Sequence, residues 1–324
     1  MITGVGAHLE ALRECVGDRV LEVAWPDPSS AGTALDVVER VTAFCRAQDV
    51  ALLHVHPFVS VPLGALAAAR LRIPYVLTVH GPSNLRADDY GGALMHGQLL
   101  EGAARVYCVC REMVDSVRAL APASRLARLP NAVDLARWSP ATRDAAGPWA
   151  VVARLDDDKV ASVRYALEAL SGLLGARFQA RVFGDGTARL ALERWLAGQP
   201  WGQRVRLEGH RDDLADVLAH GTAGVAGMTR VVLEAGALGL PVLLAGYDGV
   251  KGLVQACDME ALAARNFSGR GRPPLEAAAL AAQMAPLDTE PDRFQLRSWI
   301  AAHANEPLTW SSHLRDLEDL ASAS

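Results

Sequence analysis

The sequence predicts an α/β protein of two domains, each built on a mostly parallel sheet with helices on both faces. Short runs rich in Val and Leu alternate with amphipathic helical stretches along the chain, which is the pattern of such sheets. A segment rich in breakers and small residues, 138–148, separates two series of these runs and marks the expected boundary. The chain of 324 residues is long enough for two domains of ordinary size.

The expected elements follow in chain order. The strands before the boundary are Val20–Ala24, Ala51–Val55, Tyr75–Val79, Arg105–Val109 and Arg125–Leu129. Those after it are Trp149–Ala153, Ala180–Phe183, Val205–Glu208, Thr222–Val225 and Pro241–Ala245. Helical patterns cover Leu35–Ala47, Arg111–Leu120, Ala188–Ala197 and Leu214–Ala219. Ligands of open α/β sheets bind outside the carboxyl ends of the strands, so we expect the site in a cleft between the two domains.

Composition narrows the class of protein. The net charge of −5 gives no support for nucleic-acid binding, which usually needs a basic excess. Five cysteines, an odd number without zinc spacing, are interpreted as reduced structural thiols of a cytosolic protein. No stretch has the pattern of a transmembrane helix, and no basic residue precedes an apolar run at the start, as a signal peptide would require. We therefore expect a cytoplasmic protein.

The most informative segment is 227–241. Small residues at 224–227 are expected to form a turn that opens a helix, and this helix should end at Gly239. Unpaired N–H groups at a helix start attract phosphate, and Glu234, about two turns further on, can reach ribose hydroxyls. The segment is therefore either a seat for a nucleotide diphosphate or an ordinary parallel crossover without a ligand.

A second segment favours the nucleotide. The expected strand Trp149–Ala153 leads into Arg154, and Lys159 follows five residues later. Two cations in a strand-to-helix loop suit a diphosphate, with Arg as a fork and Lys as a point charge. Only two residues of the chain are lysines, Lys159 and Lys251, so we do not expect either to be an incidental surface residue. The alternative is a solvated cluster in which the acidic residues 156–158 neutralise both cations.

Several ordered motifs resemble retaining GT-B glycosyltransferases, in particular glycosyltransferase family 4, over nearly the whole chain. They are Thr78-Val-His-Gly81, Leu129-Pro-Asn-Ala-Val-Asp134, Arg154 with Lys159, Phe183-Gly-Asp-Gly186, Leu207-Glu-Gly-His210, and Leu233-Glu-Ala235 with Gly239-Leu-Pro-Val242. The resemblance implies two Rossmann-like domains facing one another across a cleft. The expected limits are 1–146 for the acceptor domain, 147–296 for the nucleotide-sugar domain and 297–324 for helices that cross back.

Two departures from the family pattern stand out. The second glutamate of its Glu-x7-Glu motif matches Glu234, but Ala226 stands where the first glutamate belongs. The chain also begins with Met1-Ile-Thr-Gly-Val-Gly6, which resembles the glycine loop that normally follows the first strand. We therefore expect the first strand of the N-terminal sheet to be missing.

The resemblance implies retaining, metal-independent transfer of a sugar from a nucleotide diphosphate to an acceptor hydroxyl, without a cofactor. Arg154, Lys159 and the N–H groups near Met228 and Thr229 would stabilise the leaving diphosphate. His80 would touch the donor sugar or the acceptor, or else it is a hydrogen-bonded histidine at a strand end. His54, His56 and Lys251 are interpreted as structural. The expected donor-binding residues are Gly4, Gly6, Gly184, Gly227, Met228, Thr229, Arg230 and Glu234.

Two other classes remain open. Without a carboxylate at Ala226, the chain could be a catalytically impaired relative that binds nucleotide or acts as a scaffold. A hexosamine-nucleotide epimerase shares the fold, but only the helix with Glu234 resembles it. Partners are expected to be a nucleotide sugar and a small-molecule, glycan or glycolipid acceptor, with peripheral membrane contact allowed and no nucleic acid.

The last helical pattern predicts a strap onto the N-terminal domain. Leu314, Leu317 and Leu320 recur at three-residue spacing, and Trp310 precedes them by four residues. Such spacing places all four on one apolar stripe, which must be buried. After a crossover near 291–300, the flank of the N-terminal domain is the surface within reach.

Overall fold

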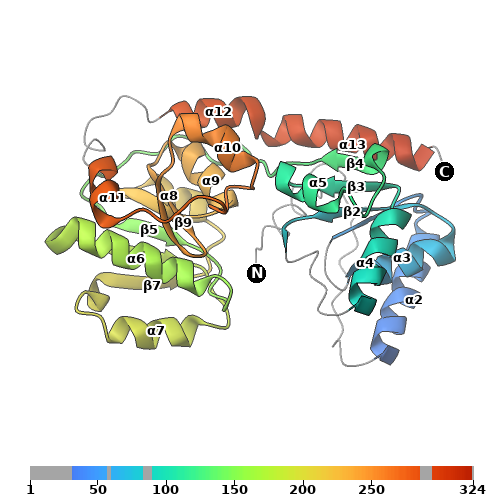
Figure 1. Cartoon of the computed structure of the whole chain (residues 1–324), viewed down its shortest axis with the longest axis horizontal. Coiled ribbons are helices and arrows are strands. Elements are labelled where there is room, and N and C mark those ends of the chain that lie inside the picture. The colour runs from blue at the N-terminus through green and yellow to red at the C-terminus, as the bar shows by residue number, and fades with distance from the viewer. Residues whose placement is uncertain (1–30, 57–59, 83–89, 285–293, 323–324) are drawn as a thin grey trace. The chain divides into compact units, whose positions relative to one another are not determined.

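The computed structural model describes residues 31–56, 60–82, 90–284 and 294–322 (Figure 1). They form two compact units: unit 1 is Asn131–Glu306, and unit 2 is the chain before Asn131 and after Glu306. Residues 131–146, which we expected in the N-terminal domain, hydrogen-bond to unit 1, as when the Ala141 amide donates to Leu238. Gly4, Gly6, the expected strand Val20–Ala24 and the missing first strand concern residues outside those described.

Unit 2 is built on a four-stranded parallel sheet in the order β1-β2-β3-β4. Its strands are β1 (Leu53–Val55), β2 (Tyr75–Val79), β3 (Arg105–Cys108) and β4 (Leu126–Arg128). They agree with the expected runs to within two residues, because a strand covered on both faces needs apolar side chains on both. The helices before unit 1 are α2 (Ala31–Ala47), α3 (Ser60–Leu71), α4 (Tyr90–Gly102) and α5 (Arg111–Val117), with a 3-10 turn at Ala123–Arg125.

The last helix, α13 (Glu306–Ser322), packs on the sheet of unit 2 (Figure 1). Trp310, Leu317 and Leu320 join one apolar cluster with the side chains of Val76, Tyr107 and Leu129. Arg105 also holds Asp316 with two hydrogen bonds of 3.2 and 2.7 Å. Three residues of the predicted C-terminal stripe, Trp310, Leu317 and Leu320, therefore pack within unit 2, whereas residues 297–306, which we expected to cross back, belong to unit 1.

Unit 1 contains a six-stranded sheet in the order β10-β9-β8-β5-β6-β7. Its strands are β5 (Trp149–Val152), β6 (Ala180–Phe183), β7 (Val205–Gly209), β8 (Gly224–Gly227), β9 (Val242–Gly246) and β10 (Gly249–Leu253). All neighbouring strands are parallel except β9 and β10, which form an antiparallel hairpin. The two parallel-sheet units establish the α/β fold class expected from the sequence.

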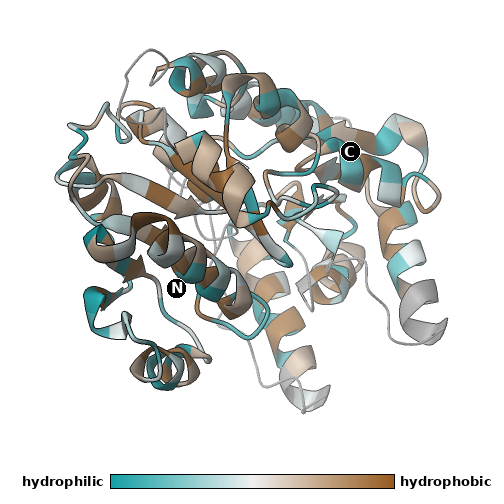
Figure 2. Ribbon diagram, turned by 60° about the vertical axis from the view of Figure 1, so that its left-hand side comes forward, coloured by the Kyte–Doolittle hydropathy of each residue, from teal (hydrophilic) through white to brown (hydrophobic). Residues whose placement is uncertain are grey.

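Helices and aliphatic clusters cover both faces of this sheet, whose strands are largely brown in Figure 2. The helices are α6 (Val160–Leu174), α7 (Arg189–Ala197), α8 (Leu214–Ala219), α9 (Arg230–Leu238), α10 (Met259–Ala263), α11 (Ala277–Met284) and α12 (Gln295–His303). Shorter 3-10 turns lie at Gly175–Arg177, Gly202–Arg204 and Ala256–Asp258. Among the described residues, no helix is long and apolar enough to cross a membrane.

Two local predictions in unit 1 are wrong. A strand was expected at Thr222–Val225 and a turn at 224–227, but strand β8 continues through Gly227. Glycine is needed there for space, since a Cβ on Gly224 would lie 2.6 Å from the Trp149 ring. Lys251, interpreted as structural, lies in β10, a strand that was not expected from the sequence and that forms because Gly246 and Gly249 allow β9 to turn back as a hairpin.

Candidate functional site

The two segments singled out in the sequence lie at neighbouring strand ends of unit 1. β5 and β8 are parallel partners, with Val151 opposite Ala226, and the strand order reverses between them. Such a switch point leaves an opening outside the carboxyl ends of the strands, where ligands of open α/β sheets bind. The loop with Arg154 and Lys159 follows β5, and the start of α9 follows β8.

The Gly-Asp-Gly turn after β6 packs directly against the loop after β5. A Cβ on Gly184 would lie only 1.8 Å from the Ala153 carbonyl oxygen, and Gly184 has a φ of +129°. The Leu155 amide donates to the Asp185 carbonyl at 2.9 Å, which ties the two turns together. Glycine at 184 therefore lets the backbone of the two turns come into contact.

The two cations of the β5–α6 loop already have acidic partners. Arg154 lies 2.9 Å from Asp156 and 3.8 Å from Asp158, and Lys159 lies 3.8 Å from Asp158. Arg154 has 36% of its side chain exposed and Lys159 18%, so both can be reached from solvent. The alternative of a neutralised charge cluster thus describes the ligand-free loop. A bound diphosphate would compete with these carboxylates for the two cations.

Lys159 also contacts the β9–β10 hairpin. Its ammonium nitrogen donates to the Tyr247 hydroxyl and lies 4.2 Å from the centre of the Tyr247 ring. Lys251, the second lysine, is fully buried and pairs with Asp248 at 2.6 Å. Both lysines of the chain therefore contact residues of one hairpin, although no sequence pattern linked them.

The loop between β8 and α9 has a strained backbone. Thr229, at the N-cap of α9, has φ +58° and ψ −124°, a conformation that residues with a Cβ rarely adopt. Its amide donates to the Phe267 carbonyl at 2.8 Å. We expected this N–H to face phosphate, but in the structure Phe267 occupies it. Met228 is buried in the apolar cluster beneath, and a Cβ on Gly227 would lie 3.0 Å from the Val152 carbonyl.

Arg230 lies between two carboxylates at the start of α9. It donates to Glu234 at 2.8 Å and to Glu306 at 3.0 Å, and its side chain is 17% exposed. The Glu234 side chain is 14% exposed and that of Glu306 is 11% exposed. Burial raises the pKa of Glu234, and the guanidinium of Arg230 opposes that rise. Glu234 is therefore buried, and its partner Arg230 is shared between two carboxylates.

Ala226 is fully buried within β8. Its methyl group belongs to the aliphatic cluster that includes Val151, Leu167 and Leu243. A carboxylate at this position would lose its hydration without gaining a partner, which is costly in an apolar core. In this chain, the role of the missing first glutamate cannot be filled from position 226.

His80 follows β2 in unit 2 and belongs to a cluster of histidines. His56 Nδ1 lies 3.1 Å from His80 Nε2, and His54 Nε2 lies 2.8 Å from the Thr78 hydroxyl. The rings of His54 and His56 stack with centroids 4.5 Å apart. One imidazole of the His56–His80 pair must donate while the other accepts, so the contact requires at least one neutral ring.

α13 contributes a fourth histidine to this cluster. The His313 ring lies 5.2 Å from His54 and 4.4 Å from Tyr107, and the side chain is nearly fully buried. Neither of its ring nitrogens has a hydrogen-bond partner within the described residues. Burial lowers the pKa of His80 and of His313 to about 4, and lowers that of His56 well below its usual value. At neutral pH these three imidazoles are uncharged.

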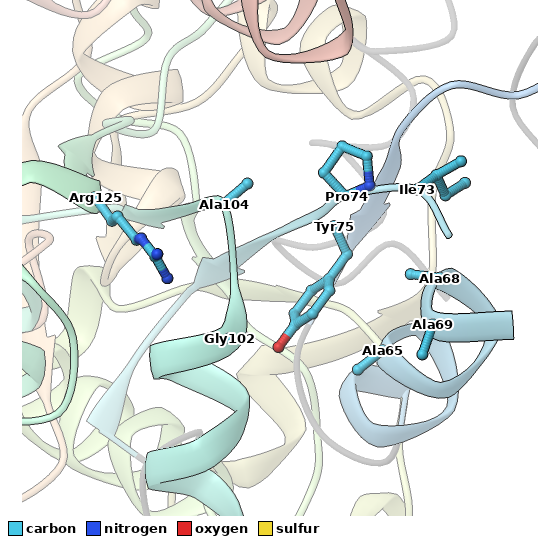
Figure 3. A pocket seen from close by; sticks show the side chains of 9 residues that line it. All are labelled: Ala65, Ala68, Ala69, Ile73, Pro74, Tyr75, Gly102, Ala104 and Arg125. Atoms are coloured by element: carbon cyan, nitrogen blue, oxygen red, sulfur yellow. The ribbon is translucent and has the colours of Figure 1, made fainter. Parts of the chain in front are cut away.

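The cavity in Figure 3 lies at the end of the unit 2 sheet where strand β2 begins, whereas His80 follows the end of β2. It has a volume of about 340 Å³ and is lined by Ala65, Ala68, Ala69, Ile73, Pro74, Tyr75, Gly102, Ala104 and Arg125. Tyr75 donates to the Leu99 carbonyl at 2.6 Å, and Arg125 donates to carbonyls at the end of α4. Its polar groups thus cap a helix, and the cavity is not a candidate site.

Comparison with known proteins defines the class. Residues 4–137 match the family model described as Glycosyltransferase Family 4, and residues 149–285 match the one described as Glycosyl transferases group 1. The chain therefore resembles GT-B glycosyltransferases of the family 4 type, and one glycosyltransferase family model matches each of its two halves. No curated protein matches the sequence.

Solved structures share this fold at low sequence identity. HepE of Anabaena in complex with UDP and glucose aligns with a TM-score of 0.72 and 17% identity, covering 96% of this chain and 89% of its own. Sucrose-phosphate synthase of Thermosynechococcus elongatus aligns at 0.70 with 18% identity, covering 99% and 93%. A glycosyltransferase of Rickettsia africae aligns at 0.69 with 13% identity, covering 97% and 88%.

Three residues described above, two in unit 1 and one in unit 2, had no signal in the sequence. Glu306 lies 76 positions from Arg230, and Tyr247 lies 88 positions from Lys159. The last helix was predicted from the spacing of its leucines, and this spacing gave no reason to single out His313. The sequence motifs thus located the strand ends, and pairing between distant side chains supplied the rest.

Proposed function

We propose that this protein transfers a sugar from a nucleotide diphosphate to an acceptor hydroxyl, with retention at the anomeric carbon and without a metal ion. One observation carries the proposal: the cations of the β5–α6 loop and the start of α9 flank the switch point of the unit 1 sheet. Retention is supported by the resemblance to family 4. Metal independence is supported because Asp156 and Asp158 pair with cations of the protein itself.

The proposed chemistry is stabilisation of a leaving group. The diphosphate gains negative charge as the glycosidic bond breaks, so fixed positive charge aimed at its oxygens lowers the barrier. Arg154 and Lys159 are proposed to supply that charge, and the backbone contact at Gly184 brings the loops close to the donor. Glu234 is proposed to accept ribose hydroxyls. His80 is proposed to contact the donor sugar or the acceptor, in the neutral form that its burial favours.

The remaining assignments belong to the same proposal. Gly4 and Gly6 are proposed to meet the donor, and Gly227, Met228, Thr229 and Arg230 to shape its site. We propose a cytoplasmic location and an acceptor that is a small molecule, a glycan or a glycolipid. The protein is proposed to need no cofactor.

The first experiment identifies the donor and tests the cations. A thermal-shift panel of UDP-, GDP-, ADP- and TDP-sugars should show one stabilising ligand. Each charge-assisted contact to a diphosphate contributes about 1.5–3 kcal/mol, so Lys159→Ala should weaken donor binding about tenfold or more. Arg206→Ala, an exposed change on β7 in the same unit, is the matched control and should bind normally. Unchanged affinity in Lys159→Ala would refute the assignment.

A second candidate is a relative that binds nucleotide without transferring sugar. The observation favouring it is the burial of Ala226, which leaves the donor without the first carboxylate of the family motif. Release of free sugar and nucleotide from the identified donor would support the transferase. Tight nucleotide binding with no turnover for any of several acceptors would support the binding protein.

A further inference from the structure

The group around Arg230 is more than an ordinary helical ion pair. Arg230 and Glu234 are four residues apart on α9, where such pairs are usually exposed and weak. Here both are largely buried, and Glu306, from a distant part of the chain, supplies a second carboxylate to the same guanidinium. Two carboxylates share one cation, and the Arg137 side chain adds a further favourable charge to Glu234.

The backbone holds Glu306 in place independently of its side chain. Its amide donates to the Val133 carbonyl at 3.1 Å, and the Val133 amide donates to the Ala304 carbonyl at 2.9 Å. Just before this pairing, α12 packs closely on α9, where a Cβ on Gly236 would lie 2.9 Å from Ile300. The backbone pairing with Val133 and the packing of α12 on α9 therefore fix the position of the Glu306 carboxylate beside Arg230.

The atoms used show what Glu306 does for Glu234. Arg230 donates through Nε to the Oε1 atom of Glu234 and through a terminal nitrogen to the Oε1 atom of Glu306. A guanidinium facing a single carboxylate tends to bind both of its oxygens in a fork. Because Glu306 accepts from the terminal nitrogen that would complete such a fork with Nε, Arg230 binds Glu234 through one oxygen.

We propose that Glu306 is a positioning residue for the nucleotide site: it holds Arg230 so that Glu234 offers its Oε2 atom to the ribose 2′-hydroxyl. This inference rests on the proposed function, which places ribose at Glu234. It adds that recognition of ribose over deoxyribose depends on a residue 72 positions further along the chain, where the chain leaves unit 1.

The test compares each nucleoside diphosphate with its 2′-deoxy form by calorimetry, using UDP, GDP and ADP. Wild-type protein should prefer the ribose form of the nucleotide it binds by about tenfold or more, the range of one charged hydrogen bond. Glu306→Gln keeps the size of the side chain but replaces the charge-assisted hydrogen bond that holds Arg230 with a weaker neutral one, so the preference should fall below about threefold. Glu260→Gln, an exposed change on α10, is the matched control and should keep the wild-type preference.

Two further measurements separate positioning from a structural role. Binding of inorganic pyrophosphate, which has no ribose, should be the same in Glu306→Gln as in wild type, which shows an intact fold and cation site. In Arg230→Met, the preference should be lost, and adding Glu306→Gln should change it no further. Nucleotide affinity of Arg230→Met should also weaken more with falling pH than that of wild type, because the guanidinium that opposes the burial-driven rise in the pKa of Glu234 is then gone.

Three results of these binding experiments would contradict the inference. Full ribose preference in Glu306→Gln, with preference lost in Arg230→Met, would overturn the positioning role of Glu306 and leave the proposed function standing. Wild-type protein that binds no nucleoside diphosphate, or does not distinguish ribose from deoxyribose, would overturn both. Loss of pyrophosphate binding in Glu306→Gln would show a general structural role and would also overturn the inference.

Discussion

Acidification should loosen unit 2 through its histidine cluster. His80 and His313 have pKa values of about 4 in the folded chain, whereas an exposed histidine has about 6.5. Below pH 6.5 the unfolded chain therefore binds more protons, and stability falls until the pH nears 4. Between pH 7 and pH 5, each of these two side chains should remove about 2 kcal/mol of stability, at 1.36 kcal/mol per pH unit.

His313 allows this to be measured one side chain at a time. His313→Leu keeps the side chain apolar and of similar length but cannot be protonated, so its loss of stability between pH 7 and pH 5 should be smaller by about 2 kcal/mol. The relevant quantity is the change with pH within each variant, which cancels any difference in packing at pH 7. Protection factors from amide hydrogen exchange of β2 and β3 report it directly.

The control is a histidine outside this cluster. His220→Gln replaces an exposed histidine of unit 1 and should leave the pH dependence of β2 and β3 unchanged. An equal loss of protection in wild type and His313→Leu would refute the reasoning, since His313 would then not be held neutral by burial. Asp316, which raises the pKa of His313, stays in place in both proteins.

Two further predictions concern the backbone of the candidate site. Gly184→Ala should destabilise unit 1 and abolish donor binding, because the added Cβ would collide with the Ala153 carbonyl. The control Gly172→Ala has open space around it in α6 and should raise stability by about 0.5–1 kcal/mol. Thermal unfolding and calorimetry of both variants check these expectations. Normal donor binding in Gly184→Ala would show that the contact between the turns is dispensable. Thr229→Gly should raise stability by about 1–3 kcal/mol in urea unfolding, because glycine adopts φ +58° and ψ −124° without strain. A lower unfolding midpoint would mean that the threonine side chain makes a contact worth more than the strain.

The sequence predicted the sheets well because their strands are buried on both faces. β2 and β6 were expected at the residues where they occur, since each is a compact run of apolar residues between polar segments. β8 was misjudged because its glycines look like a turn, and the reason for them, the Trp149 ring, comes from a neighbouring strand. β10 was missed because a glycine-rich run containing a lysine has no apolar pattern of its own.

The candidate site was predictable only in part. Arg154, Lys159 and Glu234 were found because each stands at a fixed distance from a strand end, which the chain itself encodes. Their partners come from elsewhere in unit 1: Glu306 reaches Arg230 across 76 positions and leaves no periodic signal. Side-chain pairing of this kind depends on tertiary packing, and a single sequence carries no record of it.

The packing of α13 also bears on the order in which the protein can fold as it is made. The apolar cluster around Val76, Tyr107 and Leu129 is completed by Trp310, Leu317 and Leu320. On a translating ribosome, the part of unit 2 that precedes unit 1 stays with this surface uncovered while all of unit 1 emerges. Domains made first usually fold first. Here unit 1, although made later, can finish its core before unit 2, and chaperones that shield apolar surface would act mainly during that interval.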